Sequence, residues 1–93
     1  MRTIERTGQF KKDYKRESKG QHRKVLDDTL LDVLKMILAN EPLPAKYRDH
    51  PLAGDWADHR DCHVKPDLLL IYRLPHENTL QLVRLGSHSE LGL

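Results

Sequence analysis

Apolar residues in the first half of the chain recur every three or four positions. Between residues 23 and 39 this spacing puts one apolar stripe on a single side of a helix. The stripe consists of Leu26, Leu30, Val33, Leu34 and Ile37. The pattern therefore predicts a helix over 23–39, which ends at Asn40 and Pro42 because proline cannot continue it.

A shorter, basic helix is predicted before it. Phe10 and Tyr14 lie four residues apart, so both rings fall on one side of a helix over 9–18, with lysines around the rest. Gly20 follows this segment, and glycine readily adopts the left-handed conformation that ends helices. Residues 1–7 fit a first strand.

The second half of the chain has the spacing of strands. Residues 60–65 alternate, with Cys62 and Val64 on one face. The other face carries Asp61, His63 and Lys65. Residues 68–74 form a nearly continuous apolar run, which is typical of a central strand, and residues 79–85 predict a third strand.

Short turns join these three strands. Pro66 and Asp67 suit the first turn, because proline presets φ and aspartate favours the next position. The second turn is predicted at residues 75–78, and the proline-rich residues 43–54 are predicted to be a loop. The sequence thus predicts an α+β fold, in which an N-terminal strand and two helices pack on one face of a mostly antiparallel sheet.

Length and composition favour one small domain over residues 1–93. No apolar run approaches the roughly 20 residues that span a bilayer, and the N-terminus lacks the apolar stretch of a secretory signal. We therefore expect a cytoplasmic protein without membrane association. The single cysteine, Cys62, excludes an internal disulfide and any zinc site built on paired cysteines.

Charge is unevenly distributed along the chain. Residues 1–24 contain nine basic and three acidic residues, a net charge of +6, whereas the whole chain carries +2 and the remainder −4. A basic segment of this kind suits a polyanion or an acidic protein partner. An ordinary solvated helix surface is the alternative explanation.

The candidate chemistry lies at the ends of the predicted elements. His50 stands in the proline-rich loop, and His63 faces Asp67 across the turn between two strands. Arg84 closes the last strand, and His88 points the same way if the chain stays extended beyond it. Taken singly, each residue has an ordinary explanation: the histidines as surface residues, Asp67 as a turn former and Arg84 as half of an ion pair. Together they form a candidate site.

Such a set fits the cleavage of RNA by its own 2′-hydroxyl. A base must remove the 2′ proton, and an acid must protonate the departing 5′-oxygen; histidine can do either near neutral pH. Arginine supplies donors for the phosphate charge. This chemistry needs no metal and no cofactor. A zinc site of two histidines and an aspartate is an alternative use of the same residues, although no HExxH spacing supports it.

Three spaced pieces of the sequence resemble a known family. They are DHPL-x-G-x-W from residue 49, RD-x-HV-x-PD from residue 60 and RLGSHSEL from residue 84. With looser similarity in the N-terminal half, the whole chain resembles the YafQ branch of the RelE toxins. The resemblance implies a RelE-like fold and the toxin component of a type II toxin–antitoxin system. It also implies an endoribonuclease that cuts mRNA, in many members on the ribosome, and that a small, partly acidic antitoxin inhibits.

The resemblance also implies roles for individual residues. The functional positions of the family fall on His50, His63, Asp67 and His88, and in part of the family on Arg84. His88 is then the general acid, Asp67 with His50 or His63 activates the 2′-hydroxyl, and Arg84 stabilises the phosphate. The expected substrate-binding residues are Lys46, Arg48 and Lys65.

Two other functions remain open from the sequence. One is a non-catalytic toxin on the same scaffold that binds a protein target, and the other is an RNA-binding module with incidental histidines. Gly92 marks a departure from the family, because relatives carry an aromatic residue there on which a base could stack.

Overall fold

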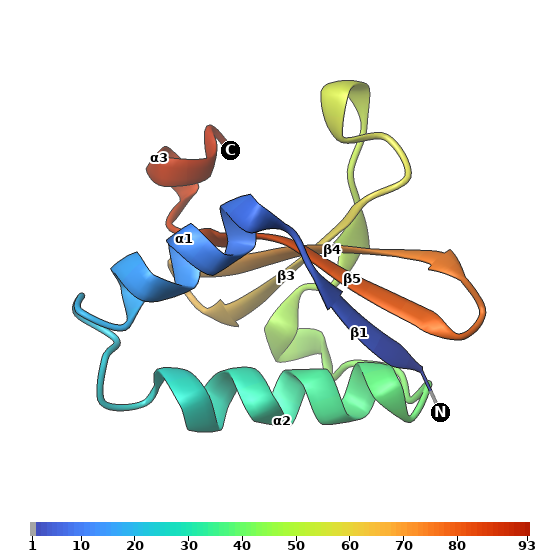
Figure 1. The fold of residues 1–93 in the computed structure, drawn as a ribbon, viewed down its shortest axis with the longest axis horizontal. Coiled ribbons are helices and arrows are strands. Elements are labelled where there is room, and N and C mark those ends of the chain that lie inside the picture. Colours follow the sequence, from blue (N-terminus) through green and yellow to red (C-terminus); the bar gives the residue numbers. More distant parts are fainter. Residues whose placement is uncertain (1) are drawn as a thin grey trace.

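Five strands form one mixed sheet in the order β1–β5–β4–β3–β2 (Figure 1). The computed structural model describes residues 2–93. The strands are β1 (Thr3–Arg6), β2 (His50–Pro51), β3 (Arg60–Lys65), β4 (Leu68–His76) and β5 (Thr79–Gly86). β1 runs parallel to β5, and the other three neighbouring pairs are antiparallel. The predicted mostly antiparallel sheet is confirmed.

The long helix α2 (Leu26–Leu38) covers one face of the sheet. It begins three residues later than the apolar pattern predicts, because residues 21–25 form turns. Leu26, Leu30, Val33 and Ile37 are buried, as predicted, and Leu34 is half-buried. Each such buried aliphatic side chain contributes about 1.5–3 kcal/mol, so this stripe is the main attachment of α2 to the sheet.

Helix α1 (Gly8–Glu17) runs along β5, beyond the point where β1 ends (Figure 1). Thr7 caps its N-terminus by accepting a hydrogen bond from the backbone of Phe10, whose ring joins the core beside α2. On its polar side, Asp13 accepts from the backbone N–H of Leu85 and Arg16 donates to the carbonyl of Leu85. Two side chains of α1 thus satisfy the open edge of β5 in place of a strand.

The opposite face of the sheet carries a helix that the sequence pattern did not predict. It is α3 (His88–Leu91), and Leu91 packs there against Leu69 and Ile71. The chain is therefore not extended beyond Ser87, so the condition under which Arg84 and His88 would point the same way is not met. Because both faces of β4 are covered, its apolar run from Leu68 to Tyr72 is continuous rather than alternating.

The predicted loop over 43–54 contains more structure than expected. Ala45–Tyr47 and Gly54–Trp56 form single 3₁₀ turns, and β2 lies between them. The carboxylate of Asp49 accepts hydrogen bonds from Arg60, at 3.0 Å, and from the hydroxyl of Tyr72, at 2.6 Å. These contacts fix the segment to β3 and β4. β4 also extends to His76, so the last hairpin turn is shorter than predicted.

None of the helices formed by residues 2–93 has the length and apolar character needed to cross a membrane.

Candidate functional site

Three imidazole rings lie in a row at one end of the sheet. His50 comes from β2, His63 from β3 and His88 from the start of α3. The ring centres of His50 and His63 are 6.4 Å apart, and those of His63 and His88 are 5.2 Å apart. The predicted convergence of a loop, a strand and the C-terminal segment is therefore confirmed, with His63 in the middle.

Asp67 lies at the His88 end of the row. Its Oδ1 accepts a hydrogen bond from the backbone N–H of His88 at 3.0 Å and lies 2.6 Å from Nδ1 of the same ring. The backbone hydrogen bond is the main cause that lowers the pKa of Asp67, so this carboxyl stays ionised at neutral pH. With Nδ1 directed at a carboxylate, Nε2 is the nitrogen of His88 that remains to exchange a proton.

Asp61 lies beside the row at the His50 end, and only 3% of its surface is exposed. Its Oδ2 is 3.6 Å from Nε2 of His50, and its Oδ1 has no hydrogen-bond partner among residues 2–93. Burial raises the pKa of Asp61, while the nearby His50, His63 and His88 oppose that rise. Nδ1 of His50 is engaged by the carbonyl of Arg48 at 2.5 Å, so Nε2 faces the carboxylate.

The alternating pattern predicts Asp61 on the polar face of β3, and no role was expected for it from the sequence. Alternation predicted that only Cys62 and Val64 of this strand would be buried, yet Asp61 is buried too. A signal was available: Asp61 and His63 are two residues apart on a strand, so they share one face. What the sequence did not reveal is that other elements cover that face.

An open groove of about 580 Å³ runs beside His63 and His88. All three residues that were expected to bind substrate, Lys46, Arg48 and Lys65, line this groove. Its wall on the helical side is formed by Thr29 and Asp32 of α2. The groove therefore presents cations beside two imidazoles, which is a suitable surface for a phosphodiester chain.

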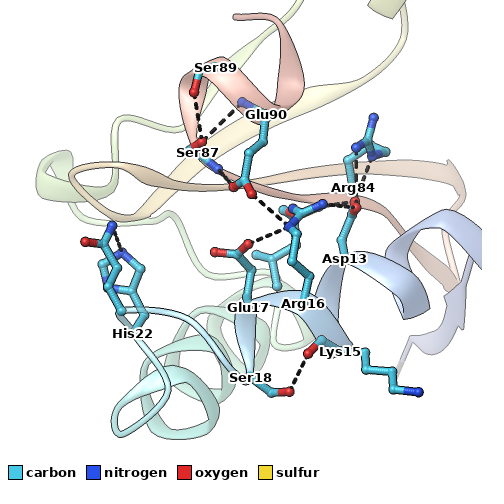
Figure 2. A network of polar contacts seen from close by, with 12 residues as sticks. Asp13, Lys15, Arg16, Glu17, Ser18, His22, Arg84, Ser87, Ser89 and Glu90 are labelled. Carbon is cyan, nitrogen blue, oxygen red and sulfur yellow. Dashed lines mark hydrogen bonds and ion pairs between the residues drawn. The ribbon is translucent and has the colours of Figure 1, made fainter.

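Arg84 does not join the row of histidines. Figure 2 shows its guanidinium turned to Asp13 of α1, where Nε donates to Oδ2 at 2.7 Å and Nη2 to Oδ1 at 3.3 Å. Asp13 is completely buried, and its pKa is lowered because hydrogen bonds from Arg84 and Leu85 outweigh the cost of burial. Arg84 is not among the described residues that line the groove. The geometry thus gives Arg84 a structural partner and does not support its expected contact with phosphate.

Two further residues, Cys62 and Gly92, have structural explanations. Cys62 is fully buried, and burial raises the pKa of its thiol, so it is a core residue rather than a nucleophile. Gly92 ends α3 at φ 73°, a left-handed conformation that favours glycine.

Within residues 2–93, no group of three histidine, cysteine, aspartate or glutamate side chains is arranged to hold a metal ion.

The fold and the site define the class to which this protein belongs. The family model described as "Bacterial toxin of type II toxin-antitoxin system, YafQ" matches residues 2–92. The chain is also 45% identical, over 93 residues, to the mRNA interferase toxin YafQ of Escherichia coli strain K12; the match covers 98% of this chain and 96% of the relative. This chain therefore belongs to the YafQ family of toxins.

Solved structures agree with this assignment. A metal-bound toxin from Helicobacter pylori is 47% identical, with a TM-score of 0.80, and the match covers 98% of this chain and 99% of that one. The YafQ chain of the E. coli DinJ–YafQ complex is 38% identical, with a TM-score of 0.79, and the match covers 98% of each chain. The predicted RelE-like α+β fold is confirmed.

Proposed function

We propose that this protein is an mRNA interferase, a metal-independent endoribonuclease that cuts single-stranded mRNA as the toxin of a type II toxin–antitoxin system. The observation that carries the proposal is the row of three imidazoles with a carboxylate at each end, beside a groove lined by basic residues. The similarity to a named mRNA interferase over nearly the whole chain supports it.

The reaction is an attack of the 2′-hydroxyl on the adjacent phosphorus. A bond forms between the 2′-oxygen and phosphorus while the bond to the 5′-oxygen breaks, which leaves a 2′,3′-cyclic phosphate and a 5′-hydroxyl. One group must accept the 2′ proton and a second must protonate the 5′-oxygen, from roughly opposite sides of the phosphorus. The ring centres of His50 and His88 lie 6.4 Å and 5.2 Å from that of His63, and in this proposal the two outer rings act on opposite sides of a phosphate bound at His63.

His88 is the general acid in this scheme. Asp67 holds Nδ1 and the backbone N–H of His88, so Nε2 is the ring nitrogen left to donate a proton to the 5′-oxygen. Because Asp67 is engaged by His88, it orients the acid rather than activating the 2′-hydroxyl directly. This assignment differs from the role that the family resemblance implied.

His50 is the better placed general base. Its Nε2 faces the buried carboxylate of Asp61, which stabilises the imidazolium formed when the ring accepts the 2′ proton. His63 stands between the two rings and can donate to a phosphate oxygen. Lys46, Arg48 and Lys65 bind the flanking phosphates through charge, independently of base identity.

The test is cleavage of a defined mRNA by purified protein, with and without ribosomes and with EDTA. The expected products carry 2′,3′-cyclic phosphate and 5′-hydroxyl ends, EDTA has no effect, and His88→Gln lowers the rate by about 10²–10⁴-fold. Loss of cleavage in EDTA would overturn the metal-independent mechanism. The absence of cleavage even on ribosomes would favour a toxin that acts by binding. A requirement for ribosomes would place the cut on translated mRNA, in the cytoplasm.

The second part of the proposal is a cognate antitoxin, a small and partly acidic protein. The E. coli YafQ chain solved with DinJ supports it, as does the net charge of +6 over residues 1–24. An open apolar groove of about 540 Å³ lies among β1, α1 and α2 and is also lined by Arg6 and Lys11. Within it, Leu31 is 49% exposed, which suits the apolar side of an acidic amphipathic segment.

Co-expression with the product of the neighbouring open reading frame tests this partner. The two proteins are expected to co-purify and cleavage to be suppressed. Leu31→Asp is expected to weaken the complex while cleavage by the free toxin is retained, because Leu31 lies outside the histidine row. Co-purification that Leu31→Asp leaves unchanged would exclude this groove as the docking surface.

A further inference from the structure

The short helix α3 carries the proposed general acid as its first residue. A four-residue helix has little stability of its own, so its position depends on what holds its ends. Ser87 and Glu90 form a capping box: the hydroxyl of Ser87 accepts from the backbone of Glu90 at 3.1 Å, and Glu90 Oε1 accepts from the backbone of Ser87 at 2.8 Å. This box fixes the direction in which His88 leaves β5.

Arg16 of α1 fastens this capping box to the rest of the domain. Figure 2 shows its guanidinium between the two helices, with Nε 2.8 Å from Glu90 Oε2 and 2.8 Å from Glu17 Oε2. Nη2 donates to the carbonyl of Leu85 at 2.8 Å, and Nη1 donates to the buried Asp13 at 3.0 Å. One side chain thus joins α1, the end of β5 and the first turn of α3.

The glycine that precedes the capping box supports this view. A Cβ at position 86 would lie 2.7 Å from Nη2 of Arg16 and 3.2 Å from Oε1 of Glu90. Gly86 therefore leaves the space that the guanidinium and the carboxylate occupy. A larger residue at this position would displace the contact between Arg16 and Glu90.

We propose that Arg16 is a positioning residue for His88: by holding Glu90 and the end of β5, it sets α3 so that the imidazole of His88 meets Asp67. The inference rests on the proposed ribonuclease function for its catalytic consequence. Its structural content, the hydrogen bond between the ring and Asp67, is independent of that function. Among the described residues, the polar contacts of Arg16 include none of the three histidines, and Arg16 does not line the groove beside them.

A planar guanidinium is required for this task. Its donors point in fixed directions and hydrogen-bond Asp13, Glu17 and the carbonyl of Leu85, while its charge also pairs with Glu90. A single ammonium group cannot match this set of contacts. Arg16→Lys is therefore expected to retain the charge but to recover only part of the effect. Glu90→Gln keeps an oxygen for the capping box and removes the charge that Arg16 binds.

The test combines steady-state cleavage kinetics with NMR of the His88 ring. Arg16→Gln is expected to lower kcat by at least about tenfold with little change in KM, because a displaced acid affects the chemical step. The Nδ1–H resonance of His88 should shift or exchange faster. The kcat of Arg16→Lys should lie between those of Arg16→Gln and wild type. Adding Glu90→Gln to Arg16→Gln should lower kcat little further.

Lys15→Gln is the matched control, because it removes one charge from the exposed side of the same helix and should leave kcat and the His88 resonance unchanged. A folded Arg16→Gln with wild-type kcat and resonance would overturn the inference. If Arg16→Gln does not fold, Arg16→Lys and Glu90→Gln decide by the same two measurements. If the wild type does not cleave RNA, the proposed function fails, whereas the NMR comparison still decides on the positioning role.

Discussion

The backbone N–H and the Nδ1 atom of His88 both meet one oxygen of Asp67, at 3.0 Å and 2.6 Å. The two residues are 21 positions apart, and the turn after β3 and the start of α3 bring them together. A single carboxylate oxygen thus contacts both the ring of His88 and the first backbone N–H of the helix that carries it. In the proposed reaction, the general acid His88 therefore acts together with Asp67 rather than alone.

Asp67→Asn is expected to lower the cleavage rate by about 10²-fold or more, because the amide cannot stabilise the imidazolium of His88. The pKa of Asp67 in the folded protein lies below its ordinary value of 3.8, so the contact favours the folded state above pH 3.8. That contribution disappears as the pH falls through the lowered pKa. Thermal unfolding should show wild type more stable than Asp67→Asn at neutral pH but not at strongly acidic pH. Equal stability at both pH values would contradict the contact.

Asp61→Asn is expected to separate stability from activity. Burial raises the pKa of Asp61 above 3.8, so the folded state binds more protons than the unfolded state between 3.8 and the raised value. Ionisation of Asp61 then lowers stability as the pH rises through this window. Asp61→Asn should consequently be at least as stable as wild type at neutral pH, measured by urea unfolding, while it cleaves RNA more slowly. The exposed Asp55→Asn is the control, and slower cleavage in both variants would rule out a specific role for Asp61.

Lys46→Gln and Lys65→Gln are expected to raise KM and leave kcat nearly unchanged. Both side chains line the groove, where they neutralise phosphates of a bound strand. Each lost phosphate contact should reduce the slope of log K against log salt by about 0.7, the value for single strands. Salt titrations of RNA binding by the inactive His88→Gln background measure this directly. Lys35→Gln, at an exposed position of α2, should leave the salt slope unchanged. An equal change in this control would show that the slope reflects the overall charge of the protein rather than contacts in the groove.

Tyr72→Phe is expected to destabilise the protein by roughly 0.5–1.5 kcal/mol, the net contribution of one hydrogen bond. The lost hydroxyl donates to Asp49, which also accepts from Arg60 and fixes the segment that carries His50. Cleavage should therefore fall by a modest factor as well, since the base is less well held. Chemical denaturation measures the first effect and initial rates the second. A stable variant with full activity would show that Arg60 alone suffices to anchor this segment.

Local spacing determined the main elements from the sequence alone. The stripe from Leu26 to Ile37 predicted α2, and alternation followed by an apolar run predicted β3 and β4. These patterns are reliable because the backbone period decides which residues face one side, whatever the rest of the chain does. The three histidines were found in the same way, as residues at the ends of elements, with the family motifs in support.

Tertiary structure alone decided the partners of the charged residues. Arg84 was expected at a phosphate, yet it pairs with Asp13, 71 positions away, and Asp61 is buried beside the histidines although its strand pattern marks it as exposed. Such pairings depend on how α1 and α3 pack on the sheet, and no local period encodes that packing. The sequence by itself thus determined which residues are available for chemistry. Long-range contacts decided which of them meet, because burial and charge pairing are properties of the assembled core.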